Sequence, residues 1–230
     1  MIPEKKYSVV IVAGGKGNRA GGDLPKQFMS VDGKPMLMYT INAFYEYDYR
    51  MRIIVVLPEG FKPMWKQLCS DHQFDIQHKL TVGGETRFHS VKNGLDEISD
   101  DETVGIHDAA RPFVTPQLIG RCFDQSFQND CGVIPVVDEV NSVRLITLDG
   151  SKMIDRKLLK VVQTPQVFPA EMIKKAYKAE YDSSFTDDAS VAEKSGAKIQ
   201  LLDGEYTNIK ITTSLDLSLA ECYLRKVSKR

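Results

Sequence analysis

Short apolar segments alternate with segments of helical periodicity along most of this chain. The apolar runs have the length of a strand and lie at residues 9–12, 53–57, 104–106, 133–137 and 199–202. The stretches between them place apolar residues three or four positions apart, which is typical of a helix with one buried face. This alternation predicts an α/β fold in which helices cover both faces of a parallel sheet.

Four of the helical segments have recognisable starting signals. Proline in the first turn and a hydroxyl at the cap position both favour a helix start. These signals predict helices that begin at Pro35, near Ser90, after Thr115, and at a cap on Ser214. The residues expected on the buried face of the first helix are Leu37, Ile41, Phe44 and Tyr45.

The segment 138–160 interrupts the alternation because it is polar and mixed. It contains Asp149-Gly150 between two short β-prone runs, a pattern that predicts a β-hairpin. A hairpin projecting from an α/β domain has little core of its own, so we expect this arm to pack on another subunit and form a homodimer. The alternative is a long surface loop.

Length and charge limit the possible classes of protein. With 230 residues, the chain is expected to form a single domain over 1–230, with the arm as an appendage. Thirty basic and 31 acidic residues give a net charge of −1, so nothing global favours a nucleic acid or an anionic membrane as partner. A polyanionic ligand must therefore be bound locally.

The cysteines and the first residues of the chain indicate the cellular compartment. Cys69, Cys122, Cys131 and Cys222 have neither metal-ligand spacing nor a dense disulfide pattern, as expected of reduced thiols. The first seven residues contain no apolar region of a signal peptide, and no apolar run approaches the roughly 20 residues that span a bilayer. We expect a cytoplasmic protein.

A glycine-rich loop follows the first apolar run. Its sequence is Ala13-Gly14-Gly15-Lys16-Gly17-Asn18-Arg19, and Lys26 follows shortly after. Glycines at the carboxyl end of a buried strand let backbone N–H groups approach a polyphosphate, and Arg19 and Lys26 supply positive charge for its oxygens. We interpret the loop as a nucleotide site; the alternative is a turn with two solvated cations.

Two other glycine motifs do not fit this loop. A dinucleotide-binding fingerprint opens a helix directly after its last small residue, here Ala20, but Gly21-Gly22 and Pro25 prevent such a helix. A Walker loop requires Ser or Thr after its Gly-Lys pair, and Gly17 stands there. The dinucleotide and Walker interpretations are therefore excluded.

Two further clusters fall where strands are expected to end. Gly83-Gly84-Glu85-Thr86-Arg87 precedes the helix near Ser90, and this second glycine turn could read a base edge or hold phosphate. The sequence His107-Asp108-Ala109-Ala110-Arg111 follows the run 104–106.

Asp108 is therefore expected at the carboxyl edge of the sheet, where a carboxylate can hold a divalent cation beside a nucleotide. Arg111 is a candidate partner for Asp108 or for phosphate; the alternative is an ion pair that closes a turn. His107 is interpreted as structural, since magnesium prefers oxygen ligands.

Three later motifs complete an ordered pattern: Gln163-Thr164-Pro165-Gln166, Thr186-Asp187-Asp188-Ala189-Ser190 and Asn208-Ile209-Lys210-Ile211-Thr212. Taken singly, the second of them predicts a helix capped by Thr186. Together with the clusters above, the pattern resembles the 2-C-methyl-D-erythritol 4-phosphate cytidylyltransferases of the non-mevalonate isoprenoid pathway. The resemblance extends over nearly the whole chain. It implies a Rossmann-like three-layer nucleotidyltransferase fold, with a mostly parallel twisted sheet and a projecting β-hairpin arm.

The resemblance also implies a reaction. CTP and a polyol phosphate would lie together with Mg²⁺, and the substrate phosphate would attack the α-phosphorus of CTP in line and expel pyrophosphate. Such a reaction needs positioning and charge neutralisation rather than a protein nucleophile.

The resemblance assigns roles to particular residues. The implied catalytic residues are Arg19, Lys26, Arg156 and Lys210. The implied nucleotide-binding residues are Ala13, Gly14, Gly15, Gly17, Gly84, Glu85, Arg87, Ser90 and Asp108, with Asp108 also holding the metal. The implied substrate-binding residues are Arg111, Ser142, Arg156, Thr164, Thr186 and Lys210. In this family the arm clasps a second subunit, so Arg156 would serve the partner's site.

The identity of the acceptor stays open at this point. Val12 and Gly14 depart from the commonest family form and match one seen in ribitol-5-phosphate cytidylyltransferases, while Asn141-Ser142 replaces the common Asp-Thr pair of the arm. The motifs at His107-Asp108 and Thr186-Asp187 favour the methylerythritol family. A glycosyltransferase is disfavoured because the chain has no Asp-x-Asp triplet, and a non-catalytic nucleotide sensor would not need this set of cations.

Overall fold

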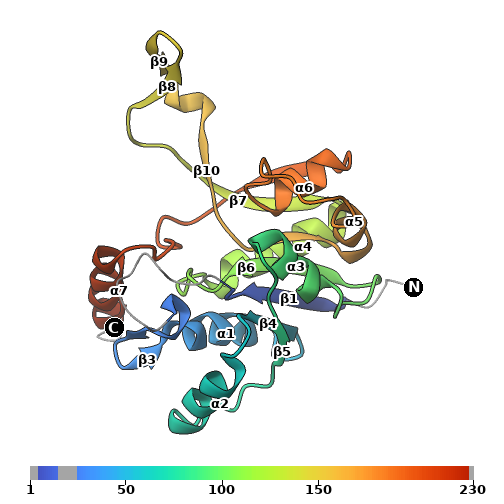
Figure 1. Ribbon diagram of the computed structural model, residues 1–230, viewed down its shortest axis with the longest axis vertical. Helices are drawn as coiled ribbons and strands as arrows, with labels where there is room; N and C mark the ends of the chain where they lie inside the picture. Colours follow the sequence, from blue (N-terminus) through green and yellow to red (C-terminus); the bar gives the residue numbers. More distant parts are fainter. Residues whose placement is uncertain (1–4, 15–24, 228–230) are drawn as a thin grey trace.

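The computed structural model describes residues 5–14 and 25–227, and these residues form an α/β fold around one large sheet (Figure 1). The strand order is β10-β7-β11-β6-β1-β4-β5, and β12 pairs with β7. The parallel neighbours on one side are β1 (Tyr7–Val12), β4 (Arg52–Leu57), β5 (Lys79–Val82) and β6 (Thr103–Asp108). The remaining strands are β7 (Gly132–Asp138), β12 (Ile199–Asp203), and the antiparallel β10 (Lys160–Val162) and β11 (Gln166–Pro169). All five predicted strands are present, and the expected mostly parallel sheet is confirmed.

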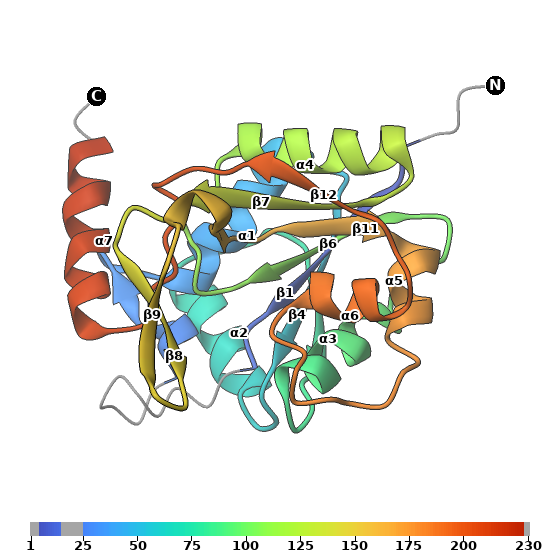
Figure 2. The same cartoon turned by 90° about the horizontal axis from the view of Figure 1, so that it is seen from above.

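Helices cover both faces of the sheet, as the sequence predicts (Figure 2). One face packs against α1 (Met36–Tyr47), α2 (Lys62–Asp71) and α4 (Pro116–Asn129). The other face packs against α3 (Arg87–Leu95), α5 (Ala170–Ala176) and α6 (Asp188–Lys194). Val9 and Ile11 of β1 point into the first core and Val10 into the second. Because both faces are buried, the strand is a continuous apolar run.

Helix starts differ from the predictions by a few residues. Helix α1 begins at Met36, because Lys34 and Pro35 form the short strand β3 (Lys34–Pro35), which pairs with β2 (Ser30–Val31). The prediction that Tyr45 lies on the buried face is wrong, since its side chain is 42 % exposed. Eight residues beyond Leu37, Tyr45 is rotated about 80° from it on a helix of 3.6 residues per turn.

Hydroxyl caps set the starts of the other helices. Thr115 caps α4 as predicted, with its Oγ1 accepting from the Leu118 N–H at 3.1 Å. Helix α3 begins at Arg87, earlier than expected, because Thr86 caps it. The last helix, α7 (Ser214–Val227), begins at Ser214, but Thr213 supplies the hydroxyl that accepts from the Asp216 N–H at 3.2 Å. The predicted cap on Ser214 is therefore wrong by one residue.

The predicted arm is a hairpin that projects from the body (Figure 1). Its strands are β8 (Val143–Thr147) and β9 (Gly150–Ile154), followed by the short 3-10 helix η2 (Arg156–Leu158). The turn residues are Leu148 and Asp149, one position earlier than expected, and Gly150 takes a φ of +131°, which favours glycine. Exposed apolar side chains of the arm include Leu145, Ile146, Leu148, Met153 and Leu158. The arm therefore has little core of its own.

Two expectations about the whole chain concern membranes and thiols. Within residues 5–14 and 25–227, no helix combines the length and the apolar character that crossing a membrane requires. All four cysteines are free; Cys122 and Cys131 are buried, Cys69 is partly buried, and Cys222 is exposed.

Candidate active site

The carboxyl edge of β1 and β6 carries the first part of the site. Val12 ends β1 and Asp108 ends β6, and the two residues are neighbours in the parallel register. The Gln27 amide donates to the carbonyl of Ala13, which attaches the 3-10 helix η1 (Lys26–Phe28) to the glycine loop. Three predicted site residues, Gly15, Gly17 and Arg19, lie outside the described residues, so their assigned roles stay predictions.

Ser90 joins the two glycine motifs. Its Oγ accepts from the Gly84 N–H at 3.1 Å and donates to the Thr86 carbonyl at 3.0 Å. A Cβ added at Gly14 would lie 3.0 Å from this Oγ, and one added at Gly83 would lie 2.9 Å from it. A side chain at either position would therefore have to displace the Ser90 hydroxyl. The structure thus brings together Gly14, Gly84 and Ser90, which the sequence assigned to the nucleoside; Glu85 is exposed on the same turn.

A charge cluster surrounds Asp108. Lys210 Nζ lies 2.7 Å from Asp108 Oδ2, and Arg87 Nε lies 3.3 Å from Asp108 Oδ1. The guanidinium of Arg87 also forms a two-pronged ion pair with Asp188, at 2.8 and 2.7 Å. Tyr177 donates its hydroxyl to Asp188 Oδ1 at 2.6 Å. The sequence predicted Arg87, Asp108 and Lys210 as site residues, and the structure places them in contact.

The pKa of Asp108 follows from two opposing causes. Burial raises this pKa, but the positive charges of Arg87 and Lys210 lower it by more, and it lies well below the usual range. Burial lowers the pKa of Arg87, but the carboxylates of Asp188 and Asp108 raise it by more, and it lies well above its usual value. Asp108 is therefore a permanent anion at the carboxyl edge, suited to contact a cation.

Sequence reasoning did not assign a role to Asp188 or Tyr177. Asp188 is fully buried. Its neighbour Asp187 is the cap of α6, and its carboxylate accepts from the Ser190 N–H at 2.9 Å. The prediction that Thr186 is the cap is therefore wrong. The sequence signal for a role of Asp188 was the pair of adjacent carboxylates at one helix start, because only one of the two can be the cap and the other needs a different partner. Tyr177 had no comparable signal in the sequence.

His107 is structural, as predicted. Its ring is fully buried; Nε2 donates to the Arg111 carbonyl at 3.1 Å, and Nδ1 accepts from the Thr164 hydroxyl at 3.1 Å. Thr164 Oγ1 in turn accepts from the Asp108 N–H at 3.1 Å. This chain of hydrogen bonds fixes a neutral imidazole and the backbone of Asp108. The predicted contact of Thr164 with substrate stays a prediction.

Arg111 does not form the ion pair with Asp108 that the sequence suggested. Its guanidinium is buried and donates to the carbonyls of Asn208 and Val162, at 2.8 and 3.2 Å. Burial lowers the pKa of Arg111, with Asp108 opposing that effect. In this structure Arg111 links the segment before Lys210 to β10, and its contact with a substrate phosphate stays a prediction.

The segment that carries Lys210 is also anchored near Lys26. Lys26 Nζ donates to the carbonyl of Thr212. The N–H groups of Thr212 and Thr213 donate to Asp216 at 2.7 and 2.8 Å, and these bonds lower the pKa of Asp216 to about 2. Two predicted cations, Lys26 and Lys210, thus lie on segments that are hydrogen-bonded to each other.

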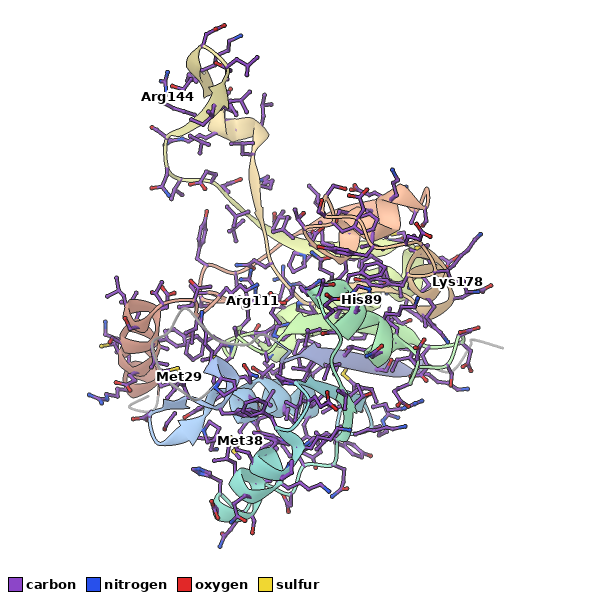
Figure 3. The ribbon with its side chains drawn as sticks, viewed as in Figure 1. Met29, Met38, His89, Arg111, Arg144 and Lys178 are labelled. Carbon is purple, nitrogen blue, oxygen red and sulfur yellow. The ribbon has the colours of Figure 1, made fainter. Side chains whose placement is uncertain are left out.

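Two predicted substrate residues lie on the arm, and a third lies just before α6. Ser142 and Arg156 belong to the arm, where Arg156 donates to the Val140 carbonyl at 2.7 Å. Figure 3 shows the arm extending as far as Arg144, well beyond the body that holds Arg111. Within a single chain Arg156 therefore lies on the arm, and its role in the site stays a prediction. Thr186 is exposed just before α6, and its contact with substrate also stays a prediction.

Folding stability is expected to fall in mild acid because of His107. Burial lowers the pKa of His107 to about 4 from an ordinary 6.5, so between these values the unfolded chain binds a proton that the folded chain does not. This difference stabilises the folded state above pH 6.5 and is lost as the pH falls. From pH 7 to pH 5 the wild type should lose about 2 kcal/mol more unfolding free energy than His107→Gln, measured by urea denaturation. Parallel pH curves for the two proteins would contradict this.

An open, mostly parallel sheet with glycine turns, two lysines and one strongly ionised carboxylate at its carboxyl edge is the arrangement of a nucleotidyltransferase. The chain belongs to the 2-C-methyl-D-erythritol 4-phosphate cytidylyltransferase family, whose model matches residues 7–226.

Individual relatives agree with this membership. The protein named 2-C-methyl-D-erythritol 4-phosphate cytidylyltransferase from Bacteroides thetaiotaomicron is 52 % identical over 219 residues, covering 95 % of this chain and 100 % of the relative. One of the same name from Phocaeicola vulgatus is 51 % identical over 213 residues, covering 93 % and 97 %. The crystal structure of the Thermus thermophilus enzyme of this name matches with a TM-score of 0.78 at 30 % identity, covering 96 % of this chain and 99 % of that one. The fold prediction is thereby confirmed.

Proposed function

We propose that this protein transfers the cytidylyl group of CTP to 2-C-methyl-D-erythritol 4-phosphate. A phosphate oxygen of the acceptor forms a bond to the α-phosphorus of CTP, the bond from that phosphorus to the bridging oxygen breaks, and pyrophosphate leaves. The observation that carries the proposal is the meeting of Lys210 and Asp108 at 2.7 Å beside the two glycine turns, in a chain of this family.

The described residues contribute mainly positioning and charge. Ser90, Gly14 and Gly84 shape the pocket for the nucleoside, where backbone groups face the base. Lys26 and Lys210 neutralise the charge that develops on the phosphates. Because the acceptor phosphate is already an anion, no protein group has to remove a proton from it.

Asp108 is the residue that we propose to hold a divalent cation. Among the described residues, no group of three or more His, Cys, Asp or Glu side chains is arranged around a metal position. A single carboxylate fits Mg²⁺ that arrives with the nucleotide, since this ion keeps water and phosphate oxygens as its other ligands. The ion would supply charge neutralisation on the phosphates. Lys210 would then leave Asp108 Oδ2 for the acceptor phosphate.

The acceptor assay tests this function. Purified protein with CTP and Mg²⁺ should release pyrophosphate with 2-C-methyl-D-erythritol 4-phosphate and much more slowly with ribitol 5-phosphate. The names and identities of the relatives support the methylerythritol acceptor over the ribitol one. A clear preference for ribitol 5-phosphate would overturn the proposal.

We further propose that the protein is a cytoplasmic homodimer in which the arm reaches the partner's site. This arrangement is supported by the exposed apolar side chains of β8 and β9, by the projection of the arm from the body (Figure 1), and by the contact of Arg156 with Val140 of the arm. A variant lacking residues 141–156 should sediment as a monomer, because the apolar contact surface is gone. Thr147→Ser, which keeps the arm, serves as control. A dimer that persists without the arm would contradict the clasp.

A further inference from the structure

A cavity lies between α2 and the segment that leads into β5. Its volume is about 500 Å³, which is within the range of small-molecule sites in proteins. Its lining residues come from positions 62–80. None of them belongs to the described part of the glycine turns, to the charge cluster at Asp108 or to the arm, so the cavity has a lining of its own, distinct from those groups.

Aromatic rings form one side of this cavity. Trp65, Phe74 and His78 lie with ring centroids between 5.8 and 6.2 Å apart. Trp65 is fully buried behind the lining, and Ile76 and Leu80 add aliphatic surface. Flat rings interact best with other flat rings in offset or edge-to-face contact. This wall therefore favours a planar, aromatic ligand.

Hydrogen bonds hold the aromatic wall in place. Trp65 Nε1 donates to His78 Nε2 at 2.8 Å, and His78 Nδ1 donates to the carbonyl of Ile76 at 2.7 Å. Both ring nitrogens of His78 are thereby used, and its imidazole is neutral. Burial lowers the pKa of His78, which keeps the ring uncharged at neutral pH. The wall is preorganised, so a ligand need not order it.

Two lysines supply charge at the cavity. Lys62 and Lys66 are one helical turn apart on α2, and both line the cavity. Within residues 5–14 and 25–227, neither lysine has a hydrogen bond or an ion pair with another side chain. Asp75 is the one carboxylate of the lining, so cations outnumber anions. An ammonium group binds a carboxylate, sulfonate or phosphate with charge-assisted hydrogen bonds.

We propose that this cavity binds a small aromatic anion, with its rings against the partly exposed Phe74 and His78, in front of the buried Trp65, and its acidic group held by Lys62 and Lys66. The site goes beyond the cytidylyl-transfer function and does not depend on it. Trp65 is the only tryptophan of the chain, so its fluorescence reports directly on the occupant.

The test uses 8-anilinonaphthalene-1-sulfonate as probe and energy transfer from Trp65 as signal. Transfer should saturate with probe concentration and persist in saturating CTP. The variant Lys62→Met/Lys66→Met should bind the probe about tenfold more weakly. The control Lys175→Met/Lys178→Met should bind it normally; Lys175 lies in the last turn of α5 and Lys178 (labelled in Figure 3) just after that helix. N-phenyl-1-naphthylamine, which has the same rings without the sulfonate, should bind more weakly, and its affinity should be the same for the wild type and for Lys62→Met/Lys66→Met.

Two results would overturn the proposal. One is unchanged probe affinity in Lys62→Met/Lys66→Met, which would show that the lysines hold no anion. The other is loss of the energy transfer on addition of CTP, which would place the probe in the nucleotide site. Both lysines are at least partly exposed, so their variants are expected to melt at the temperature of the wild type, and a thermal scan verifies this.

Discussion

The variant Asp108→Asn should turn over at least about 100-fold more slowly than the wild type while remaining folded. Asparagine keeps the volume of the side chain but removes the charge that faces Lys210 and the proposed cation. Because the carboxylate stays ionised far below neutral pH, the loss should be equally large across the whole working pH range. The measurement is pyrophosphate release over a titration of Mg²⁺.

Asp101→Asn is the matched control for this experiment. Asp101 is an exposed aspartate paired with Lys6 on the surface, outside the proposed site. Its variant should keep the turnover and the Mg²⁺ dependence of the wild type. Wild-type turnover at unchanged Mg²⁺ in Asp108→Asn would remove Asp108 from the mechanism.

The variant Arg87→Met should lose about 3–5 kcal/mol of unfolding free energy. Asp188 is fully buried, and without the guanidinium the Tyr177 hydroxyl would be the one side-chain partner of its charge within the described part of the chain. Removal of one partner of a buried ion pair leaves an uncompensated charge, which is the source of the large effect. Urea denaturation at one fixed protein concentration provides the measurement.

A double variant separates the charge effect from lost packing. Arg87→Met/Asp188→Asn removes both charges, so it should be more stable than Arg87→Met alone. Asp101→Asn again serves as control and should keep the wild-type urea midpoint. Equal stability of the single and double variants would mean that burial of the Asp188 charge costs nothing, against the structure.

Local patterns predicted much of the fold correctly. Strand β1 was predictable because Val9, Val10 and Ile11 are all apolar, which requires burial on both faces. Helix α4 was predictable from Thr115 followed by proline. Tyr45 was misplaced because its position at the margin of a helix face depends on what packs there. The shift of the arm turn to Leu148 arose because a two-residue hairpin is set by strand register, not by the turn residues alone.

Part of the site was also predictable from local patterns, and part was not. The Asp108 position followed from an apolar run that ends at a polar residue, a signal within one short segment. The role of Asp188 could not be predicted, since its partner Arg87 is 101 positions away. Arg111 is a further case: its sequence neighbours suggested Asp108 as partner, but the fold presents two backbone carbonyls from distant segments instead.

By itself, the sequence determined five strands of the main sheet, the glycine turns and the family to which the chain belongs, because each of these depends on residue type and spacing along short segments. Only the tertiary structure decided which charges meet: Lys210 with Asp108, Arg87 with Asp188, and Lys26 with the segment of Thr212. Those contacts depend on the strand order, which places the ends of β1 and β6 side by side. Electrostatic interactions fall with distance in space, and distance along the chain does not specify it.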